Sequence, residues 1–142
     1  MSWIGHRLVP RLIPALQHLY EENEEMHSIY FISTGEFAYV LPVHDNAVYF
    51  SVLKGTVIGF EDYPYYLSEK NKPFDKLDDL AENRSSVQRK FSVMSAKKAQ
   101  ALELSITDLI EMQKEFPLLV KKLYRDAEKN LVKILIQRVY VN

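Results

Sequence analysis

The segment Leu53-Lys-Gly-Thr-Val-Ile-Gly-Phe-Glu61 decides the fold, together with Arg89-Lys-Phe-Ser-Val-Met-Ser95 further along the chain. The first segment ends a strand-like run in a glycine turn and then brings in acidic residues. The second places an arginine directly before an alternating, strand-like run. Glycine is the usual residue where the backbone needs a positive φ, so Gly55 and Gly59 indicate turns. We interpret the two segments as the exit from a β-sheet and the return to it.

Short runs rich in β-branched and aromatic residues surround these two segments, and each ends at a turn signal. They lie at residues 28–33, 37–41, 47–53, 56–59, 90–95 and 99–104. Several short strands separated by turns predict an antiparallel sandwich, roll or barrel. Residues 61–88 between them are polar and irregular, and we predict a long loop there. A loop of this length inside a compact domain usually has a function or is disordered.

Helical periodicity appears at both ends of the chain. Residues 3–20 place apolar side chains on one helical face but carry Pro10 and Pro14, so we predict two short helices. Residues 105–139 are predicted as two longer helices, with Ser105 as the N-cap of the first and Pro117 in the first turn of the second. The second helix carries a buried-type stripe stepping by four and three residues: Val120, Tyr124, Ala127, Leu131 and Ile134.

Composition narrows the class of protein. A chain of 142 residues corresponds to one domain, predicted to span 1–142. A formal net charge of −1 lacks the basic excess of most nucleic-acid binders, and the absence of cysteine removes disulfides and thiol chemistry. No apolar run approaches the roughly 20 residues that cross a bilayer, and the N-terminus does not resemble a signal peptide. We therefore expect a cytoplasmic domain that meets a membrane only through a larger parent protein.

The joint order of these motifs resembles the cyclic nucleotide-binding domain family. Ser28-Ile-Tyr-Phe-Ile-Ser-Thr-Gly-Glu36 is similar to the family's strand that ends in a turn glycine. The segment 53–61 is similar to its entry into the phosphate-binding cassette, and Arg89-Lys-Phe-Ser-Val93 to its exit. The resemblance implies an α+β fold, an antiparallel, jelly-roll-like β-roll flanked by short N-terminal helices and two C-terminal helices.

Within this family, the chain most resembles the cytosolic C-terminal domains of voltage-gated-like cation channels. The segment that carries this resemblance is Asp108-Leu-Ile-Glu-Met-Gln-Lys-Glu-Phe-Pro117. In such channels the domain follows the pore and assembles as a tetramer. The resemblance therefore implies an ion-channel setting and an oligomer. The length of the C-terminal helix beyond Asn130 independently favours Leu131, Ile134, Leu135 and Val139 as contacts of a neighbouring subunit or partner. The alternative is that the apolar stripe of this helix only packs on the roll.

The same resemblance assigns a candidate ligand site to Gly59, Glu61, Arg89 and Ser92. Arg89 would bind a cyclic phosphate through charge-assisted hydrogen bonds, with Ser92 as a second donor. Glu61 would accept the ribose hydroxyl, and Gly59 would form the turn. Each has a simpler alternative: Arg89 and Glu61 as solvated side chains, and Ser92 as an ordinary strand residue.

Two departures from the family's sequence pattern help to decide between two possible functions. Phe60 stands where the family usually has Glu, and residues 60–88 make an unusually long cassette. Both favour a homology domain that acts in regulation and assembly without a nucleotide. The alternative is a genuine sensor of cAMP or cGMP that acts through movement of the C-terminal helix. Neither function is enzymatic, and neither requires a cofactor.

Two further groups of residues complete the sequence predictions. Tyr63, Tyr65 and Tyr66 are expected to pin the long loop to the sheet, with stacking on a purine as the alternative. The four histidines lack the close pairing of a metal site, so no metal is expected.

Overall fold

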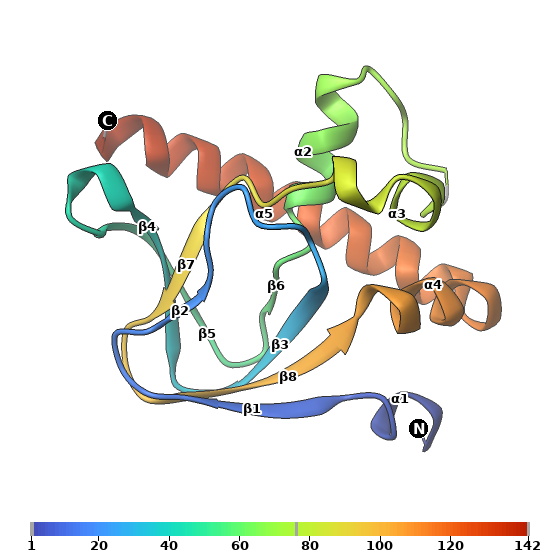
Figure 1. The fold of residues 1–142 in the computed structure, drawn as a ribbon, viewed down its shortest axis with the longest axis horizontal. Helices are drawn as coiled ribbons and strands as arrows, with labels where there is room; N and C mark the ends of the chain where they lie inside the picture. Colours follow the sequence, from blue (N-terminus) through green and yellow to red (C-terminus); the bar gives the residue numbers. More distant parts are fainter. Residues whose placement is uncertain (1, 76, 142) are drawn as a thin grey trace.

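Two four-stranded antiparallel sheets form the β part of the computed structural model, which describes residues 2–75 and 77–141. Their strand orders are β1-β8-β3-β6 and β2-β7-β4-β5. The strands are β1 (Val9–Ile13), β2 (His18–Tyr20), β3 (Ser28–Thr34), β4 (Glu36–Leu41), β5 (Ala47–Leu53), β6 (Val57–Ile58), β7 (Ser92–Ser95) and β8 (Ala99–Ser105). The sheets curve around a common interior, which confirms the predicted α+β β-roll (Figure 1).

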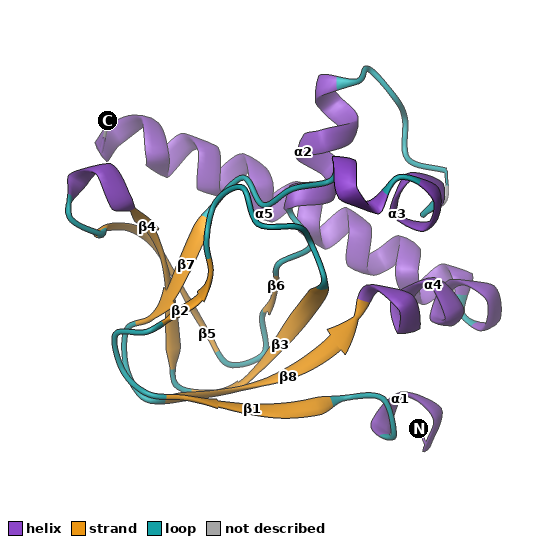
Figure 2. Ribbon diagram, in the orientation of Figure 1, coloured by secondary structure: helices purple, strands orange, loops and turns teal. Residues whose placement is uncertain are grey.

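Most of the helices lie together along one side of the roll, whereas the short N-terminal helix lies beside the start of β1 (Figure 2). They are α1 (Ser2–Gly5), α2 (Asp62–Glu69), α3 (Asp78–Glu82), α4 (Ile106–Glu115) and α5 (Pro117–Val141), with 3-10 turns at Pro42–His44 and Arg84–Ser86. Helix α5 passes over the roll toward the β4–β5 hairpin and packs against β5, β6 and α2 (Figure 1). Among the described residues, no helix is both long and apolar enough to cross a membrane.

The N-terminal prediction is wrong. Residues 3–20 form only the short α1, and the chain then enters the roll as β1 and β2, so the roll begins at Val9 and not at residue 28. Pro10 is compatible with β1 because that strand lies at the edge of its sheet, where a missing N–H breaks no ladder. Leu16 has a φ of 64° in the turn between the strands, which no helix allows.

The predicted loop at 61–88 is also wrong in part, because it contains α2 and α3. Pro64 lies in the first turn of α2, where backbone N–H groups have no helical partner, so the proline costs no hydrogen bond. The buried Tyr63 and Leu67 share one side of α2. Tertiary packing of that side stabilises a helix that its composition alone does not reveal.

The C-terminal prediction is confirmed. The Ser105 hydroxyl accepts a hydrogen bond from the Asp108 N–H at 3.1 Å, and α5 begins at Pro117. The predicted stripe of α5 is buried, at Val120, Tyr124, Ala127, Leu131 and Ile134. Its first part packs under α2 and α4, and its last two members enter the core between the sheets. Leu131 and Ile134 are therefore core residues, whereas Val139 is 73% exposed.

Candidate functional site

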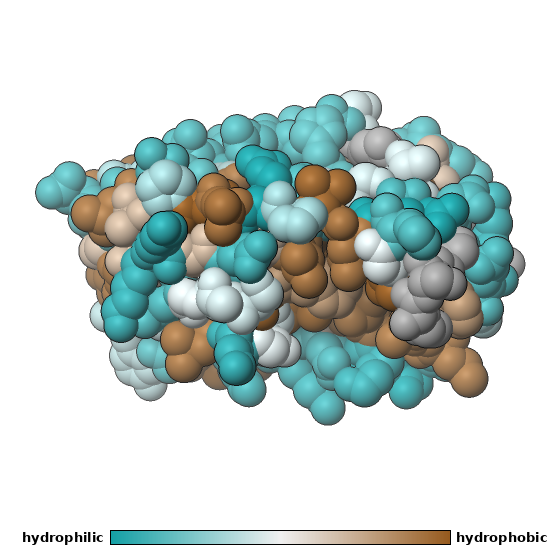
Figure 3. Space-filling model, turned by 90° about the horizontal axis from the view of Figure 1, so that it is seen from below, coloured by the Kyte–Doolittle hydropathy of each residue, from teal (hydrophilic) through white to brown (hydrophobic). Residues whose placement is uncertain are grey.

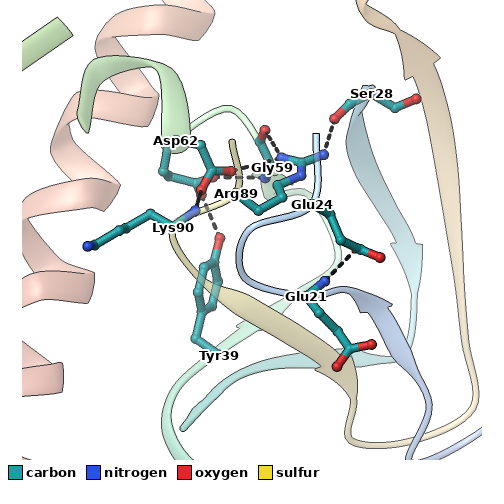
Figure 4. Close-up of polar contacts among 9 residues, drawn as sticks. Glu21, Glu24, Ser28, Tyr39, Gly59, Asp62, Arg89 and Lys90 are labelled. Atoms are coloured by element: carbon teal, nitrogen blue, oxygen red, sulfur yellow. Dashed lines mark hydrogen bonds and ion pairs between the residues drawn. The ribbon is translucent and has the colours of Figure 1, made fainter. Parts of the chain in front are cut away.

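Arg89 lies at the centre of a buried polar cluster. Its Nη1 donates to the Asp62 carboxylate at 2.8 Å and to the Gly59 carbonyl at 2.5 Å, and its Nη2 donates to the Ser28 carbonyl at 2.6 Å. The side chain is only 3% exposed. Figure 4 shows Asp62, Gly59 and Ser28 arranged around the guanidinium group. These contacts engage both Nη1–H groups and one Nη2–H group of Arg89.

The flat face of the guanidinium is covered as well. Its carbon lies 3.9 Å from the centroid of the Tyr20 ring, the geometry of a cation–π contact. Tyr20 in turn stacks on Tyr30, with ring centroids 6.2 Å apart. The backbone of Arg89 is tied to the turn after β2, because its N–H donates to the Glu24 carbonyl at 2.7 Å. Both the side chain and the main chain of Arg89 are thus fixed.

Asp62 is the counter-ion of Arg89 and comes from the first residue of α2. One carboxylate oxygen accepts from Arg89, and the other accepts from the Lys90 N–H at 2.7 Å. Burial raises the pKa of Asp62, while the adjacent Arg89 charge and these hydrogen bonds oppose that rise. A carboxylate is also stabilised near the positive N-terminus of a helix.

Glu61 is turned to the interior and does not face solvent. Its carboxyl accepts from the Tyr39 hydroxyl at 2.7 Å and from the Gly59 N–H at 2.8 Å, and the residue is 1% exposed. Burial, with a smaller contribution from the charge of Asp62, raises the pKa of Glu61 to about 7. The acceptor proposed for a ribose hydroxyl is engaged by the protein itself.

Gly59 shapes the turn that brings these groups together. Its φ is 89°, so its predicted turn role is confirmed. A Cβ at this position would lie 3.2 Å from Nη1 of Arg89 and 3.3 Å from the Tyr30 ring. Glycine is required here both by the backbone conformation and by the close approach of Arg89.

Ser92, the second donor expected for a phosphate, has a different partner. Its hydroxyl oxygen accepts from the Glu22 N–H at 3.0 Å, and the residue is buried in β7. It fixes the turn after β2 against the strand that follows Arg89. The structure thus gathers Gly59, Glu61 and Arg89 into one cluster and gives Ser92 a separate bond to that turn.

Aromatic side chains fill the roll interior beside this cluster. Tyr39 meets the edges of Phe50 and Phe91 at centroid distances of 5.8 and 6.0 Å. Tyr65 of α2 meets Phe91 at 6.3 Å, and Arg138 of α5 lies 5.7 Å from the centre of the same ring. The interior of the roll beside the cluster is thus occupied by this chain's own aromatic rings.

The rings of Tyr63 and Phe74 link the insert to Tyr124 of α5. Tyr63 stacks between Phe60 and Tyr66 at 6.3 and 6.2 Å, and Phe74 stacks on Tyr124 of α5 at 3.8 Å. Tyr65 reaches the sheet side at Phe91, as predicted. Tyr63 also meets the edge of Tyr124 at 6.2 Å, and it belongs to the buried cluster that contains Ile29 of β3 and Leu104 of β8.

Four members of the cluster were not found by sequence reasoning: Asp62, Tyr39, Tyr20 and the Ser28 carbonyl. Only Asp62 could have been recognised in the sequence, because it is a second acidic residue directly after Glu61. The others lie on strands, where a tyrosine or a carbonyl looks like any core position. Within residues 2–75 and 77–141, no three His, Cys, Asp or Glu side chains gather as a metal site would require.

Solved structures with this fold are numerous, although no protein-family model and no curated protein matches the sequence. A protein of Geobacter metallireducens GS-15 named for cyclic nucleotide binding is 13% identical, with a TM-score of 0.63 over 94% of this chain and 83% of that one. The c-di-GMP-responsive global regulator CLP of Xanthomonas campestris is 11% identical, with a TM-score of 0.66 over 98% of this chain and 59% of the regulator.

The C-linker/CNBHD of zELK channels is a further match. It is 15% identical and superposes with a TM-score of 0.62 over 91% of this chain and 55% of the channel fragment. The chain therefore has the cyclic nucleotide-binding domain fold, as the sequence motifs predicted.

Proposed function

We propose that this chain is a regulatory and assembly domain that keeps the cyclic nucleotide-binding fold but works without a bound cyclic nucleotide. The carrying observation is the ion pair of Arg89 with Asp62, 2.8 Å long and buried on both sides. The side chain best suited to a cyclic phosphate already holds an anion supplied by α2.

The energetics of displacement support this proposal. A ligand phosphate would have to replace the Asp62 carboxylate and leave that carboxylate buried without its cation. Breaking a buried pair in this way costs about 3–5 kcal/mol, which is two to more than three orders of magnitude in affinity. A solvated arginine would carry no such penalty, so the buried pair itself disfavours nucleotide binding.

A nucleotide sensor remains the second candidate function, and one observation favours it. Gly59, Glu61 and Arg89 meet at the N-terminus of α2, and the N–H groups at such a terminus attract anions. In a sensor, the phosphate would displace Asp62, and α2 would shift against α5. The two functions therefore differ in whether Asp62 yields to a ligand.

Calorimetric titration with cAMP and cGMP up to millimolar concentration tests the proposal. The wild-type protein should give no saturable heat. Asp62→Asn is the matched variant, because it keeps the shape of the side chain and removes its charge. Its fold is checked by circular dichroism and thermal unfolding before titration. Saturable binding to the wild-type protein would overturn the proposal and establish the sensor.

The setting of the domain stays a prediction. The sequence of residues 108–117 favours an ion channel as the parent protein, and the structural likeness to the zELK domain agrees with this setting. Likeness to the CLP regulator agrees equally with a bacterial regulator. In either setting, the proposed domain would act through contacts of its helices and not through catalysis.

A further inference from the structure

Helix α5 presents a basic face on the side turned away from the roll. Because a helix turns by about 100° per residue, four basic residues lie within about 40° of the direction opposite the buried stripe. These exposed residues are Lys122, Arg125, Lys129 and Lys133. The only two acidic residues of the helix, Asp126 and Glu128, lie outside this sector. A chain with a formal net charge of −1 thus carries one strongly positive strip.

Most of this charge is not neutralised within the chain. An unbroken row of cations recurs at every fourth residue of α5: Lys121, Arg125, Lys129 and Lys133. None of the four takes part in an ion pair among the described residues, although Lys122 beside them pairs with Asp126 at 3.1 Å. Like charges at this spacing are neighbours on the helix surface and destabilise the helix. An anionic partner along the row would remove that repulsion.

Apolar side chains share the basic face. Leu118, Ile136 and Tyr140 lie in the same outward sector and are 80%, 50% and 82% exposed. Lysine and arginine can extend their charged ends to the lipid headgroups while their stems cover apolar surface beside them. Basic and apolar residues together on an exposed helix are typical of helices that lie on anionic membranes. A nucleic acid would use the charges but leave the apolar side chains in water.

A cavity of about 300 Å³ opens at the edge of this face, between α5 and the turn from β5 to β6. Its lining includes Lys129, Asn130 and Lys133 of α5 with Gly55 and Thr56 of the turn. Asp126 lines it too, but its carboxylate is held by Lys122. The two free lysines can therefore donate charge-assisted hydrogen bonds to a phosphate group in this cavity, with the neutral Asn130 and Thr56 as further donors.

We propose that the outward face of α5 docks on an anionic phospholipid surface, with a lipid phosphate in the cavity beside Lys129 and Lys133. The helix lies flat on the bilayer and keeps its buried stripe in the core, so docking requires no unfolding. A second copy of the chain is a poor occupant, because its own α5 would set like charges against the row. The proposal goes beyond the proposed function and does not depend on nucleotide binding. It replaces the expectation that the chain meets a membrane only through a larger parent protein.

The other exposed apolar surface lacks free cations beside it. Figure 3 views the molecule from the side of β1, where hydrophobic residues gather in the middle of the face. Leu12 of β1 is 71% exposed, but the arginine next to it, Arg11, is paired with Glu103 at 2.8 Å. An apolar face whose cation is already paired does not select anionic lipid. Leu12 is therefore the matched control for Leu118.

Co-sedimentation of the chain with lipid vesicles tests the proposal. Vesicles of phosphatidylcholine with about 30% phosphatidylserine should bind the wild-type chain at about 0.1 M salt, and vesicles of phosphatidylcholine alone should not. Joint Lys129→Glu and Lys133→Glu should lower the partition coefficient at least about tenfold, because each basic residue near an anionic surface contributes about fivefold. Circular dichroism confirms that each variant is folded.

The matched control makes the same charge change elsewhere. Lys97 and Lys98 are exposed in the turn between β7 and β8, which lies away from α5 at the other end of the roll (Figure 1). Joint Lys97→Glu and Lys98→Glu should change the partition coefficient by less than about twofold, because salt screens charges that do not face the bilayer.

Salt and apolar variants separate a membrane from another polyanion. Binding to the anionic vesicles should fall steeply as salt rises from about 0.1 to 0.5 M. Leu118→Ser should weaken vesicle binding about threefold to tenfold, because its side chain enters the lipid boundary, and Leu12→Ser should leave binding unchanged. A mixed-sequence DNA duplex is the comparison polyanion, and Leu118→Ser should have no effect on any binding to it.

Four outcomes overturn the proposal. They are a wild-type chain that does not bind anionic vesicles at low salt, equal binding to neutral and anionic vesicles, an equal loss of binding in the Lys97 and Lys98 control, and binding to the DNA duplex that is tighter than binding to vesicles. None of them bears on cyclic nucleotides, which calorimetry measures on the same samples. Failure of membrane docking and failure of nucleotide independence are thus seen separately.

Discussion

Two clusters of side chains meet at Phe60 and Glu61, and each attaches the segment after β6 to the rest of the domain. One does so through charges and hydrogen bonds, the other through aromatic rings. The Arg89 cluster (Gly59, Glu61, Asp62, Arg89 and Tyr39) joins the turn after β6 to the entry of β7 through charges and hydrogen bonds. The aromatic cluster (Phe60, Tyr63, Tyr66, Phe74 and Tyr124) ties the insert to α5 with stacked rings. Consecutive residues serve the two clusters, since Phe60 joins the rings and Glu61 joins the charges.

The comparison shows how each kind of cluster responds to change. A buried ion pair depends on both partners, because removal of one leaves an unpaired charge in a medium of low dielectric. Stacked rings lose contact area gradually and carry no charge to leave behind. We therefore expect the Arg89 cluster to be sensitive to single substitutions and to pH, and the aromatic cluster to be more tolerant and independent of pH.

The largest expected effect is on Arg89 itself. Arg89→Ala should lower the free energy of unfolding by about 3–5 kcal/mol, because Asp62 stays buried without its cation. Urea denaturation measures this change. Lys90→Ala is the matched control: its side chain is exposed and makes one cation–π contact with Tyr65, worth about 1 kcal/mol or less.

Equal losses for the two variants would contradict the central role of Arg89. A further variant sharpens the point. Joint replacement of Arg89 by Met and of Asp62 by Leu should recover part of the stability that Arg89→Ala loses, since no unpaired charge remains.

The second effect is a dependence of stability on pH through Glu61. Its pKa is raised from 4.5 in the unfolded chain to about 7 in the folded protein, so the folded state binds more protons between these values. The free energy of unfolding should then fall as pH rises from about 4.5 to 7, by roughly 3 kcal/mol from this group. Below pH 4.5 its contribution is constant.

Glu61→Gln removes this titration and keeps groups that can bond to Tyr39 and Gly59. Urea denaturation from pH 4.5 to 8 should give a profile for the variant that falls less with rising pH than the wild-type profile. Titrating groups away from this cluster contribute equally to both proteins, so the difference between the profiles reports Glu61 together with its interaction with Asp62. Parallel profiles would show that Glu61 does not titrate in this range.

The smallest effect belongs to the aromatic cluster. A double-mutant cycle of Phe74→Leu and Tyr124→Leu should give a coupling free energy of about 0.5–1.5 kcal/mol, because the two rings stack at 3.8 Å. The value should not change between pH 5 and 8. A cycle of Phe74→Leu with Tyr49→Leu, whose ring belongs to the other core, should give no coupling. Coupling in that second cycle would mean that the aromatic cluster is not independent of the core between the sheets.

The fold could be predicted as far as local patterns reach. Strand runs, turn glycines and the Ser105 and Pro117 signals all act within a few residues, and the structure confirms them. The prediction of helices at residues 3–20 was wrong because the spacing of their apolar residues is equally compatible with edge strands. Strand β8 supplies the partner that makes Val9–Ile13 a strand. Helix α2 was not predicted because packing against α5 stabilises it, and α5 lies far away in the sequence.

The candidate site divides in the same way. The sequence by itself determined which residues lie at the turn after β6 and at the entry to β7, because the glycine turn and the arginine before β7 are local motifs. Only the tertiary structure decided that Asp62 pairs with Arg89 and that Glu61 bonds to Tyr39, since these bonds join residues from α2, β4 and the entry to β7. It likewise decided which stripe of α5 is buried and which faces outward. Periodicity identifies faces of a helix, but the assignment of a face to the core depends on what packs against it.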